Sequence, residues 1–316
     1  MESTSSPSPA ASTSGAQRLH LPPSSLVICS RNRPTLLQET VESVLRADEL
    51  PTEIVVVDQS DVEHPTLGAL TASNGCEIRY FWSRSVGSSL ARNTGLSLAR
   101  HDIIAFIDDD MRVAPDWYGA LIRALLEAGP HTVVTGRVLA GSSDVSGGFV
   151  SAVHPWEEPR SYSGRINRDI LATGHMALCR SAIEEVGGLD QRLGPGTRFP
   201  GAEDNDLGFR LLEASYRVVY APDSVIYHRA WRTRRGYVPL YWRYGRGQGA
   251  FYAKHLTLRD RYMLRRAGQD FGRYLRLLPR RIWRRRLLEL SGSTAFLLGI
   301  ISGAAEWILT ERGPRA

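Results

Sequence analysis

The strongest constraint on the fold is a run of apolar residues that leads directly into three aspartates, residues 103–110 (IIAFIDDD). A short apolar run rich in Ile and Phe predicts a buried strand. Alternate side chains of a strand share a face, so Asp108 and Asp110 are expected to point the same way. Two carboxylates at the end of a buried strand suit Mg²⁺ or Mn²⁺, which bind carboxylates together with phosphates. An isolated run of aspartates is more typical of a solvated turn, so the neighbouring sequence has to decide.

The sequence before this run alternates between strand-like and helix-like segments. Residues 25–30 (SLVICS) and 53–58 (EIVVVD) are apolar runs of strand length. Residues 35–46 carry apolar side chains at helical spacing after Pro34, which favours a helix start. The other predicted segments are a helix over 65–73, a strand over 77–82 and a loop with a helix over 86–100. This order predicts an α/β fold with a Rossmann-like, mostly parallel sheet flanked by helices, in which residues 24–110 form a nucleotide-binding half.

The second half of the predicted domain, residues 111–230, leads to a histidine at its end. The predicted elements are helices over 117–127, 181–186 and 203–215 and strands over 132–139, 173–180, 218–221 and 225–227. The last short strand is followed by His228. Open α/β sheets bind ligands at the carboxyl ends of their strands. We therefore expect the acidic residues and His228 to gather at one edge of the sheet.

Two candidate donor-binding positions precede the acidic strand. Asp58 ends a strand and could accept hydrogen bonds from a base or a ribose, although an aspartate there is equally typical of a turn. Gly87 would let a ligand approach the backbone. Arg92 could bridge a diphosphate with its planar guanidinium, and an ordinary solvated helix arginine is the alternative.

The candidate catalytic carboxylates come from a predicted helix start. Glu203 and Asp204 follow a flexible loop and could act as a general base, since deprotonating an alcohol needs a positioned carboxylate. The alternative is ordinary acidic charge at a helix N-terminus, which is stabilising by itself. His228 could complete a metal site beside the aspartates, whereas a lone histidine after a strand is more often structural.

The charge of the chain is divided unevenly along its 316 residues. Between Arg229 and Arg286 there are 18 Lys and Arg residues and only 2 Asp, whereas the remainder has 21 basic and 31 acidic residues. Such a basic segment favours polyanionic partners. We expect no nucleic acid, because no known binding module is present. The three cysteines have no disulfide or zinc spacing, which indicates a reducing compartment.

The two ends of the chain are predicted to differ from the domain. Residues 1–23 are expected to be a disordered tail without a secretory signal. Residues 231–316 are expected to be a basic, partly apolar helical extension, which mixes aromatics, Arg and Gly at 237–255, is densely cationic at 273–286 and is apolar, as a last helix, at 294–309. The last helix is shorter than the ~20 residues of a membrane span, so an interfacial position is favoured. Membrane docking through the arginines and through Trp231, Trp242, Trp283 and Trp307 is one hypothesis, and a solvated helical face with a last core helix is the other.

Taken together, these motifs resemble the family 2 glycosyltransferases of the GT-A fold. The resemblance covers about residues 24–230 and rests on ICSRNRP, IVVVDQSD, VGSSLARNTGLSLARHDIIAFIDDDM, GHMALCRSAIEEVGGLD, GAEDNDLGFRL and YAPDSVIYHR. It implies that Asp204 is the catalytic base, with Glu203 as the fallback. It implies that Asp110 and His228 hold Mg²⁺ or Mn²⁺, and that Asp108 meets the ribose. The residues assigned to the donor are Ser30, Arg31, Asp58, Gly87, Arg92, Asp108 and Asp109. The residues assigned to the acceptor are Trp156, Gly174 and His175.

The resemblance implies transfer of one sugar, with inversion, from a nucleoside-diphosphate sugar to an acceptor hydroxyl. We find no Gln-x-x-Arg-Trp pattern typical of processive synthases. A lipid-linked or cell-envelope glycan acceptor would fit a peripheral position on the inner, cytoplasmic face of a membrane. Two alternatives remain: a sugar-nucleotide nucleotidyltransferase, and a non-catalytic, membrane-associated protein that binds nucleotide sugars.

Overall fold

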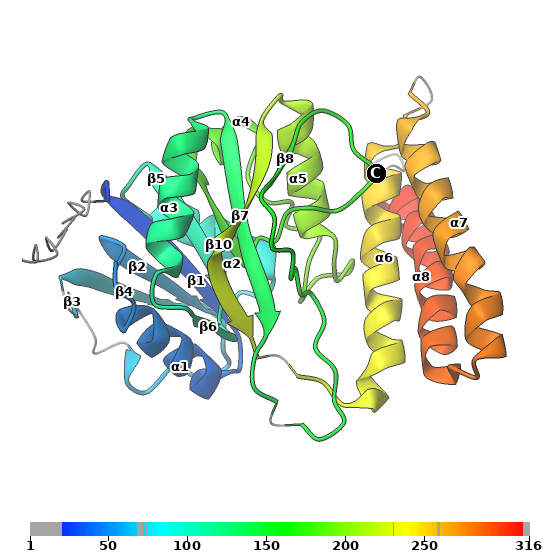
Figure 1. Cartoon of the computed structure of the whole chain (residues 1–316), viewed down its shortest axis with the longest axis horizontal. Helices are drawn as coiled ribbons and strands as arrows, with labels where there is room; N and C mark the ends of the chain where they lie inside the picture. Colours follow the sequence, from blue (N-terminus) through cyan, green and yellow to red (C-terminus); the bar gives the residue numbers. More distant parts are fainter. Residues whose placement is uncertain are drawn as a thin grey trace, which may run out of the picture.

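The apolar runs form one mixed sheet at the centre of the molecule (Figure 1). The computed structural model describes residues 21–67, 72–73, 75–143, 145–229, 231–257 and 260–311. Within these ranges the sheet has ten strands, in the order β3-β4-β2-β1-β5-β9-β7-β10-β6, with β8 paired to β10. The strands are β1 (Ser24–Ser30), β2 (Glu53–Asp58), β3 (Ala72–Ser73), β4 (Cys76–Trp82), β5 (Ile103–Asp108), β6 (Met111–Val113), β7 (Thr132–Ala140), β8 (Arg160–Tyr162), β9 (His175–Cys179) and β10 (Arg217–His228).

Several strands that precede predicted site residues end at the same edge of the sheet. β1 lies between β2 and β5, and all three are parallel. Their register places Ser30 beside Asp58 and Cys29 beside Asp108. β9 runs antiparallel to both β5 and β7, so β7 and its parallel neighbour β10 point the same way as β5. This mostly parallel sheet agrees with the predicted fold class.

Helices cover both faces of the sheet because the strands are apolar on both sides. Leu26 and Ile28 of β1 pack in one core with α1 (Pro34–Leu45) and α3 (Trp117–Ala128). Val27, on the opposite face, packs in a second core with α2 (Ser88–Leu98) and α5 (Glu203–Glu213). The short α4 (Arg180–Glu185) adds to the second core. This alternation is the expected pattern for a strand buried between two layers of helices.

Three long helices form a further layer beside the sheet. They are α6 (Tyr237–His255), which follows the 3-10 turn η2 (Arg234–Gly236), α7 (Tyr262–Trp283) and α8 (Leu287–Glu311). Figure 1 shows the three side by side at one end of the molecule, with α7 and α8 joined by a tight turn. Among the described helices, α8 alone is long and apolar enough to cross a membrane, a test that buried core helices also pass.

Glycines allow α6 and α8 to pack backbone against backbone. A Cβ atom added to Gly249 would lie 2.1 Å from the carbonyl oxygen of Ile300, and one added to Gly303 would lie 2.0 Å from that of Arg246. Gly245 and Gly299 approach each other in the same way. Both helices therefore carry glycines four residues apart at their contact, the spacing that permits close helix crossings.

The structure corrects several predicted segments. Residues 72–73 form β3 and are not the end of a helix over 65–73, while 68–71 lie outside the described residues. The strands predicted over 218–221 and 225–227 are one strand, β10, with an irregularity between them. The helix predicted over 294–309 is longer, since α8 has 25 residues. Of the predicted tail, residues 1–20 lie outside the described part of the chain.

Candidate active site

A cavity of about 630 Å³ lies at the edge where β1, β5 and β10 end. The side chains that line it come from segments far apart in the sequence. Predicted site residues on its wall are Ser30, Arg31, Gly87, Arg92, Asp108, Asp109, Asp110, Glu203, Asp204 and His228. The structure thus brings ten of the predicted residues to one cavity.

The three aspartates are arranged differently from the prediction. β5 ends at Asp108, and Asp109 and Asp110 form the turn that follows. Arg33 Nη1 lies 3.0 Å from Asp109 Oδ1 and 2.8 Å from Asp110 Oδ2, so the two turn residues share one guanidinium. Asp108 instead accepts a 2.6 Å hydrogen bond from Arg92 Nη2. Strand alternation does not extend to Asp110, because β5 ends at Asp108, but Asp108 and Asp110 both line the cavity.

The two turn carboxylates differ in their electrostatic environment. Burial raises the pKa of Asp109 to about 7, although Arg33 and a 2.6 Å hydrogen bond from Ser30 Oγ favour its charged form. Burial also disfavours the charged form of Asp110, but His228 and Arg33 hold its pKa below the usual range. Asp110 is therefore the more strongly ionised of the pair. In turn its charge raises the pKa of His228 against the effect of burial.

Asp110 and His228 fit a divalent cation. Asp110 Oδ1 is buried without a hydrogen-bond partner and lies 3.5 Å from His228 Nε2. His228 Nδ1 lies 2.9 Å from the carbonyl oxygen of Ser151. A proton on Nδ1 would leave the Nε2 lone pair facing Asp110, as metal-ligating histidines require. No group of three or more His, Cys, Asp or Glu suited to a metal occurs among the described residues, so other ligands would have to come from the donor or from water.

The second pair of carboxylates lies at the N-terminus of α5. Glu203 and Asp204 begin the helix after Ala202, which has a left-handed backbone with φ +64°. Thr173 Oγ1 donates a hydrogen bond to Asp204. Burial, with the neighbouring charge of Asp204, raises the pKa of Glu203 to about 8. Burial also raises the pKa of Asp204, while Arg92 and Thr173 favour its charged form.

Arg92 connects the two acidic groups. Its side chain is buried, its Nη2 binds Asp108, and its Nη1 lies 3.6 Å from Glu203 Oε1. Burial would lower the pKa of Arg92, but Asp108 and Glu203 raise it, so the guanidinium stays charged. The solvated helix arginine considered as an alternative is therefore excluded by the structure.

Four predicted residues do not line this cavity. Both carboxylate oxygens of Asp58 are already bonded, one to Ser60 and one to Tyr80 Oη at 2.8 Å. Gly174 packs behind Asp108, since an added Cβ would lie 2.2 Å from Asp108 Oδ2. Gly174 was assigned to the acceptor, as were the other two residues, His175 and Trp156.

Neither of these two acceptor candidates reaches the cavity. His175 is fully buried, its Nε2 lies 2.8 Å from Ser224 Oγ, and burial lowers its pKa to about 3. Trp156 packs its ring against Tyr220 and under the guanidinium of Arg160. We therefore remove His175 and Trp156 from the candidate acceptor residues, because their side chains are committed to packing.

Sequence reasoning missed two parts of the cavity wall. Arg33 was overlooked although it follows Arg31 in the first loop, where two arginines near a predicted phosphate site were a usable signal. The far wall comes from the C-terminal helices, and its residues are Tyr244, Gln248, Asp270, Arg273, Tyr274 and Phe296. No local pattern marks these side chains, because only the packing of α6, α7 and α8 brings them to the site.

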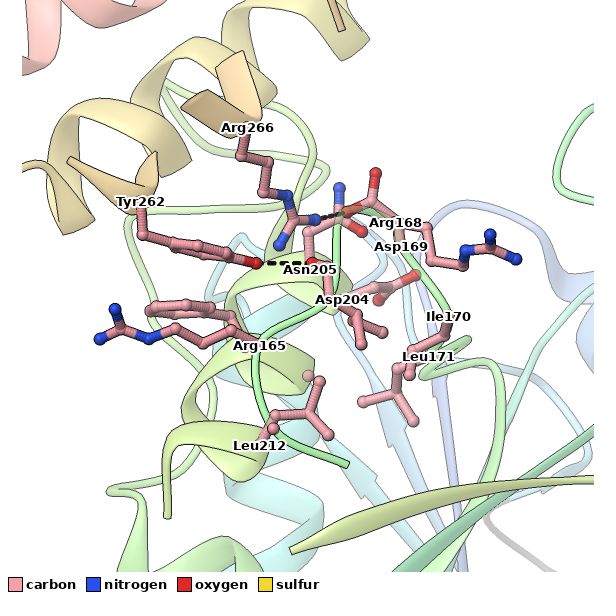
Figure 2. Close-up of a pocket in the computed structure, with 14 residues that line it drawn as sticks. Arg165, Arg168, Asp169, Ile170, Leu171, Asp204, Asn205, Leu212, Tyr262 and Arg266 are labelled. Atoms are coloured by element: carbon pink, nitrogen blue, oxygen red, sulfur yellow. Dashed lines mark hydrogen bonds and ion pairs between the residues drawn. The ribbon is translucent and has the colours of Figure 1, made fainter. Parts of the chain in front are cut away.

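A smaller cavity of about 10 Å³ shares Asp204, Asn205 and Asp169 with the large one (Figure 2). There Arg266 of α7 forms an ion pair with Asp169, a residue that also lines the large cavity. Tyr262 Oη donates a 2.6 Å hydrogen bond to the carbonyl oxygen of Ile166. These contacts fasten α7 to the loop before β9.

A chain of hydrogen bonds also joins the start of α5 to α7. Asn205 Nδ2 donates to Gln248 Oε1 at 2.7 Å, and Gln248 Nε2 donates to Tyr252 Oη at 2.8 Å. Tyr252 donates to Asp270, which accepts a 2.6 Å hydrogen bond from Arg273. The residue after Asp204 is thus connected to the basic helix through buried polar groups of α6.

Comparisons with known proteins agree with this geometry. The family model "Glycosyl transferase family 2" matches residues 25–187. A glucosyl-dolichyl phosphate glucuronosyltransferase of Haloferax volcanii is 26% identical over 219 residues, 66% of this chain and 70% of the relative. A hyaluronan synthase of Pasteurella multocida is 31% identical over 116 residues, which are 36% of this chain and only 12% of the synthase.

Solved structures share the fold. A mannosyltransferase from Pyrobaculum calidifontis in complex with GDP-Man and Mn²⁺ has a TM-score of 0.57 at 17% identity, covering 92% of this chain and 80% of that one. GalNAc-T7 with UDP, GalNAc and Mn²⁺ has a TM-score of 0.53 at 21% identity, covering 74% and 50%. The predicted fold class is therefore confirmed, with helices after the GT-A sheet. The chain belongs to glycosyltransferase family 2 and is a glycosyltransferase that uses a nucleotide-sugar donor.

Proposed function

We propose that the chain transfers one sugar per encounter, with inversion, to a hydroxyl of a lipid-linked or cell-envelope glycan. The observation that carries this proposal is the placement of two acidic groups on one cavity. The group Asp108–Asp110 and the pair Glu203–Asp204 both line it, and Arg92 lies between them. An inverting displacement needs two separate acidic groups. One would hold the cation that binds the leaving diphosphate, and the other would accept the proton of the attacking hydroxyl.

The donor diphosphate would lie on the side of Arg33 and Asp110. The planar guanidinium of Arg33 suits a phosphate, and Ser30, whose hydroxyl donates to Asp109, lines the same cavity together with Gly87. Asp110 and His228 would hold Mg²⁺ or Mn²⁺. When bound, the cation would offset negative charge on the departing nucleoside diphosphate. Structural neighbours that contain Mn²⁺ support this assignment.

The base in this proposal is Asp204. Burial and the charge of Asp204 raise the pKa of Glu203 to about 8, whereas Arg92 and the hydrogen bond from Thr173 favour the charged form of Asp204. Asp204 would accept the proton of the acceptor hydroxyl while the oxygen forms a bond to the anomeric carbon. The bond from that carbon to the diphosphate oxygen breaks on the opposite side, which inverts the configuration. A raised pKa makes Asp204 a stronger base than an exposed aspartate.

Two observations support a lipid-linked acceptor at a cytoplasmic membrane face. The Haloferax volcanii relative is named for a glucosyl-dolichyl phosphate substrate and matches two thirds of this chain. The cysteines Cys29, Cys76 and Cys179 are free thiols, which suits a reducing compartment. The nucleotidyltransferase and non-catalytic alternatives are not retained, because the chain belongs to a glycosyltransferase family.

The test uses a panel of nucleotide sugars with Mn²⁺ and a lipid-linked acceptor. Asp204→Asn should still bind the donor but should lose transfer by about 10²–10⁴-fold, the usual contribution of a general base. Asp110→Asn should weaken Mn²⁺-dependent donor binding. Asp116→Asn, at an exposed aspartate outside the cavity, is the matched control and should retain activity.

The anomeric configuration of the product, read by NMR, tests the mechanism separately. Inversion relative to the donor is expected. Retention, or full transfer by the Asp204 variant, would contradict the assigned base.

A further inference from the structure

The turn between α7 and α8 carries an unusual combination of side chains. Residues 275–288, here called the hairpin tip, read LRLLPRRIWRRRLL. They comprise six arginines, seven apolar residues and one proline, with no acidic residue. Pro279 lies within α7, which ends shortly afterwards at Trp283.

The apolar side chains of the hairpin tip are exposed. Trp283 is 81% exposed, Leu287 69% and Ile282 60%. Leu275 is also exposed, on the preceding turns of α7. Large apolar side chains that cluster on the surface of a protein indicate a site that contacts another protein or a membrane.

The charge of the hairpin tip is only partly compensated. Glu289 pairs with Arg286 at 3.0 Å and with Arg281 at 3.6 Å. Among the described residues, no carboxylate forms an ion pair with the other four arginines of the tip, which are Arg276, Arg280, Arg284 and Arg285. A net positive surface mixed with Trp, Ile and Leu complements the interface of an anionic bilayer, where indole rings lie among the headgroups and arginines meet lipid phosphates.

The rest of α8 is fastened to the protein. Glu306 forms ion pairs with Arg198 and Arg246, and Arg192 pairs with Glu311. Trp307 is buried against Phe199, so it is not available for the headgroup contact considered from the sequence. These contacts, together with the glycine crossing with α6, favour α8 as part of the folded chain and leave the hairpin tip as the docking element.

We propose that the hairpin tip docks on the surface of an anionic lipid bilayer. Arg273 of the cavity wall and Trp283 of the tip are ten residues apart in α7, a distance of about 15 Å along the helix. Docking therefore holds the C-terminal wall of the cavity within about 15 Å of the lipid surface. In Figure 1 the α7–α8 turn lies at the lower end of the view, the end at which β7 and β10 also finish. This inference does not depend on the proposed acceptor, because vesicle binding is measured without sugar transfer.

The experiment is co-sedimentation of the full chain with vesicles of phosphatidylcholine alone or mixed with phosphatidylglycerol. Binding should require the anionic lipid and should weaken as salt is raised. The triple variant Arg280→Ala, Arg284→Ala, Arg285→Ala should bind about 100-fold more weakly, since each arginine near an anionic surface contributes about fivefold. Trp283→Ala should also weaken binding.

The matched control removes three exposed arginines far from the tip. The triple variant Arg46→Ala, Arg100→Ala, Arg112→Ala makes the same charge change and should bind vesicles like the parent chain. The thermal unfolding of each variant is measured to check that the substitutions leave the fold intact.

Three results would overturn the proposal. They are equal binding to neutral vesicles, equal loss in the tip and control variants, and no vesicle binding by the parent chain. A parent chain that self-associates through the tip, with loss of dimer in the Trp283 variant and no lipid binding, would assign the surface to a second copy instead.

Discussion

Replacing Arg92 tests the electrostatic arrangement on which the active site depends. Its guanidinium is buried between Asp108, at 2.6 Å, and Glu203, at 3.6 Å. Arg92→Met keeps an unbranched side chain but removes the charge. The carboxylates that face it then have no cation beside them, whereas Arg92→Lys keeps a positive charge and serves as the conservative comparison.

The size of the expected loss of unfolding free energy depends on how deeply Asp108 and Glu203, the partners of Arg92, are buried. Removing one member of a buried ion pair typically costs 3–5 kcal/mol. Asp108 is about one third exposed, so solvent screens its interaction with Arg92. We therefore expect Arg92→Met to lose about 3 kcal/mol of unfolding free energy at a pH where Glu203 would be ionised.

The loss of unfolding free energy in Arg92→Met should be larger at high pH than at low pH. Burial, and next the charge of Asp204, raises the pKa of Glu203 from 4.5 to about 8. A raised carboxyl pKa makes stability fall as the pH rises from the unfolded value to the folded value. Without Arg92 the folded pKa is higher still, so the fall continues further into the alkaline range. Near pH 5.5, Glu203 is neutral in both folded proteins, and the loss should shrink to about 1 kcal/mol.

The assay is urea unfolding of the parent chain, Arg92→Met and Arg92→Lys at about pH 5.5 and about pH 9. The difference in unfolding free energy between the parent chain and Arg92→Met should be clearly larger at the higher pH. Equal losses at both pH values would refute the view that Arg92 opposes ionised carboxylates in the cavity.

Two further predictions concern other parts of the structure. Arg33→Ala removes the cation shared by Asp109 and Asp110, so the variant should melt at a lower temperature than the parent chain. Added Mn²⁺ should raise its melting temperature more than that of the parent, and an equal Mn²⁺ effect would contradict the shared role of these carboxylates. Gly249→Ala places a methyl group against the backbone of α8 and should destabilise the chain by about 1–3 kcal/mol in urea unfolding. Gly268→Ala, where nothing lies within 4 Å, should instead stabilise it by about 0.5–1 kcal/mol, and similar effects of the two variants would refute the close packing.

The sequence predicted most of the sheet because its strands are continuous apolar runs. The apolar runs at 25–30, 53–58 and 103–110 predicted strands and their alternation with helices predicted a parallel sheet, and the structure shows that these strands are neighbours whose carboxyl ends meet at one edge. The acidic helix start at Glu203 was also predicted, and the structure places it on the same cavity as the aspartates.

What could not be predicted depends on contacts between distant residues. The turn at Asp109 is held by Ser30 and Arg33, which lie more than seventy positions earlier, so strand alternation does not describe the turn. His175 has the same residue type as a functional histidine, but β9 passes through the middle of the sheet and buries it. The far wall of the cavity depends on how α6 and α7 pack, and no short motif encodes that.

The hydrogen-bond chain from Asn205 to Arg273 limits how the protein can be shortened. A version that ended after α6 would retain Gln248 and Tyr252 but would lose Asp270, the carboxylate that ends the chain. The Tyr252 hydroxyl would lose its acceptor, and Tyr252 is joined through Gln248 to Asn205, the residue after Asp204. The smallest autonomous catalyst obtainable from this gene product should therefore extend through α7, well past the last residue that the family model recognises.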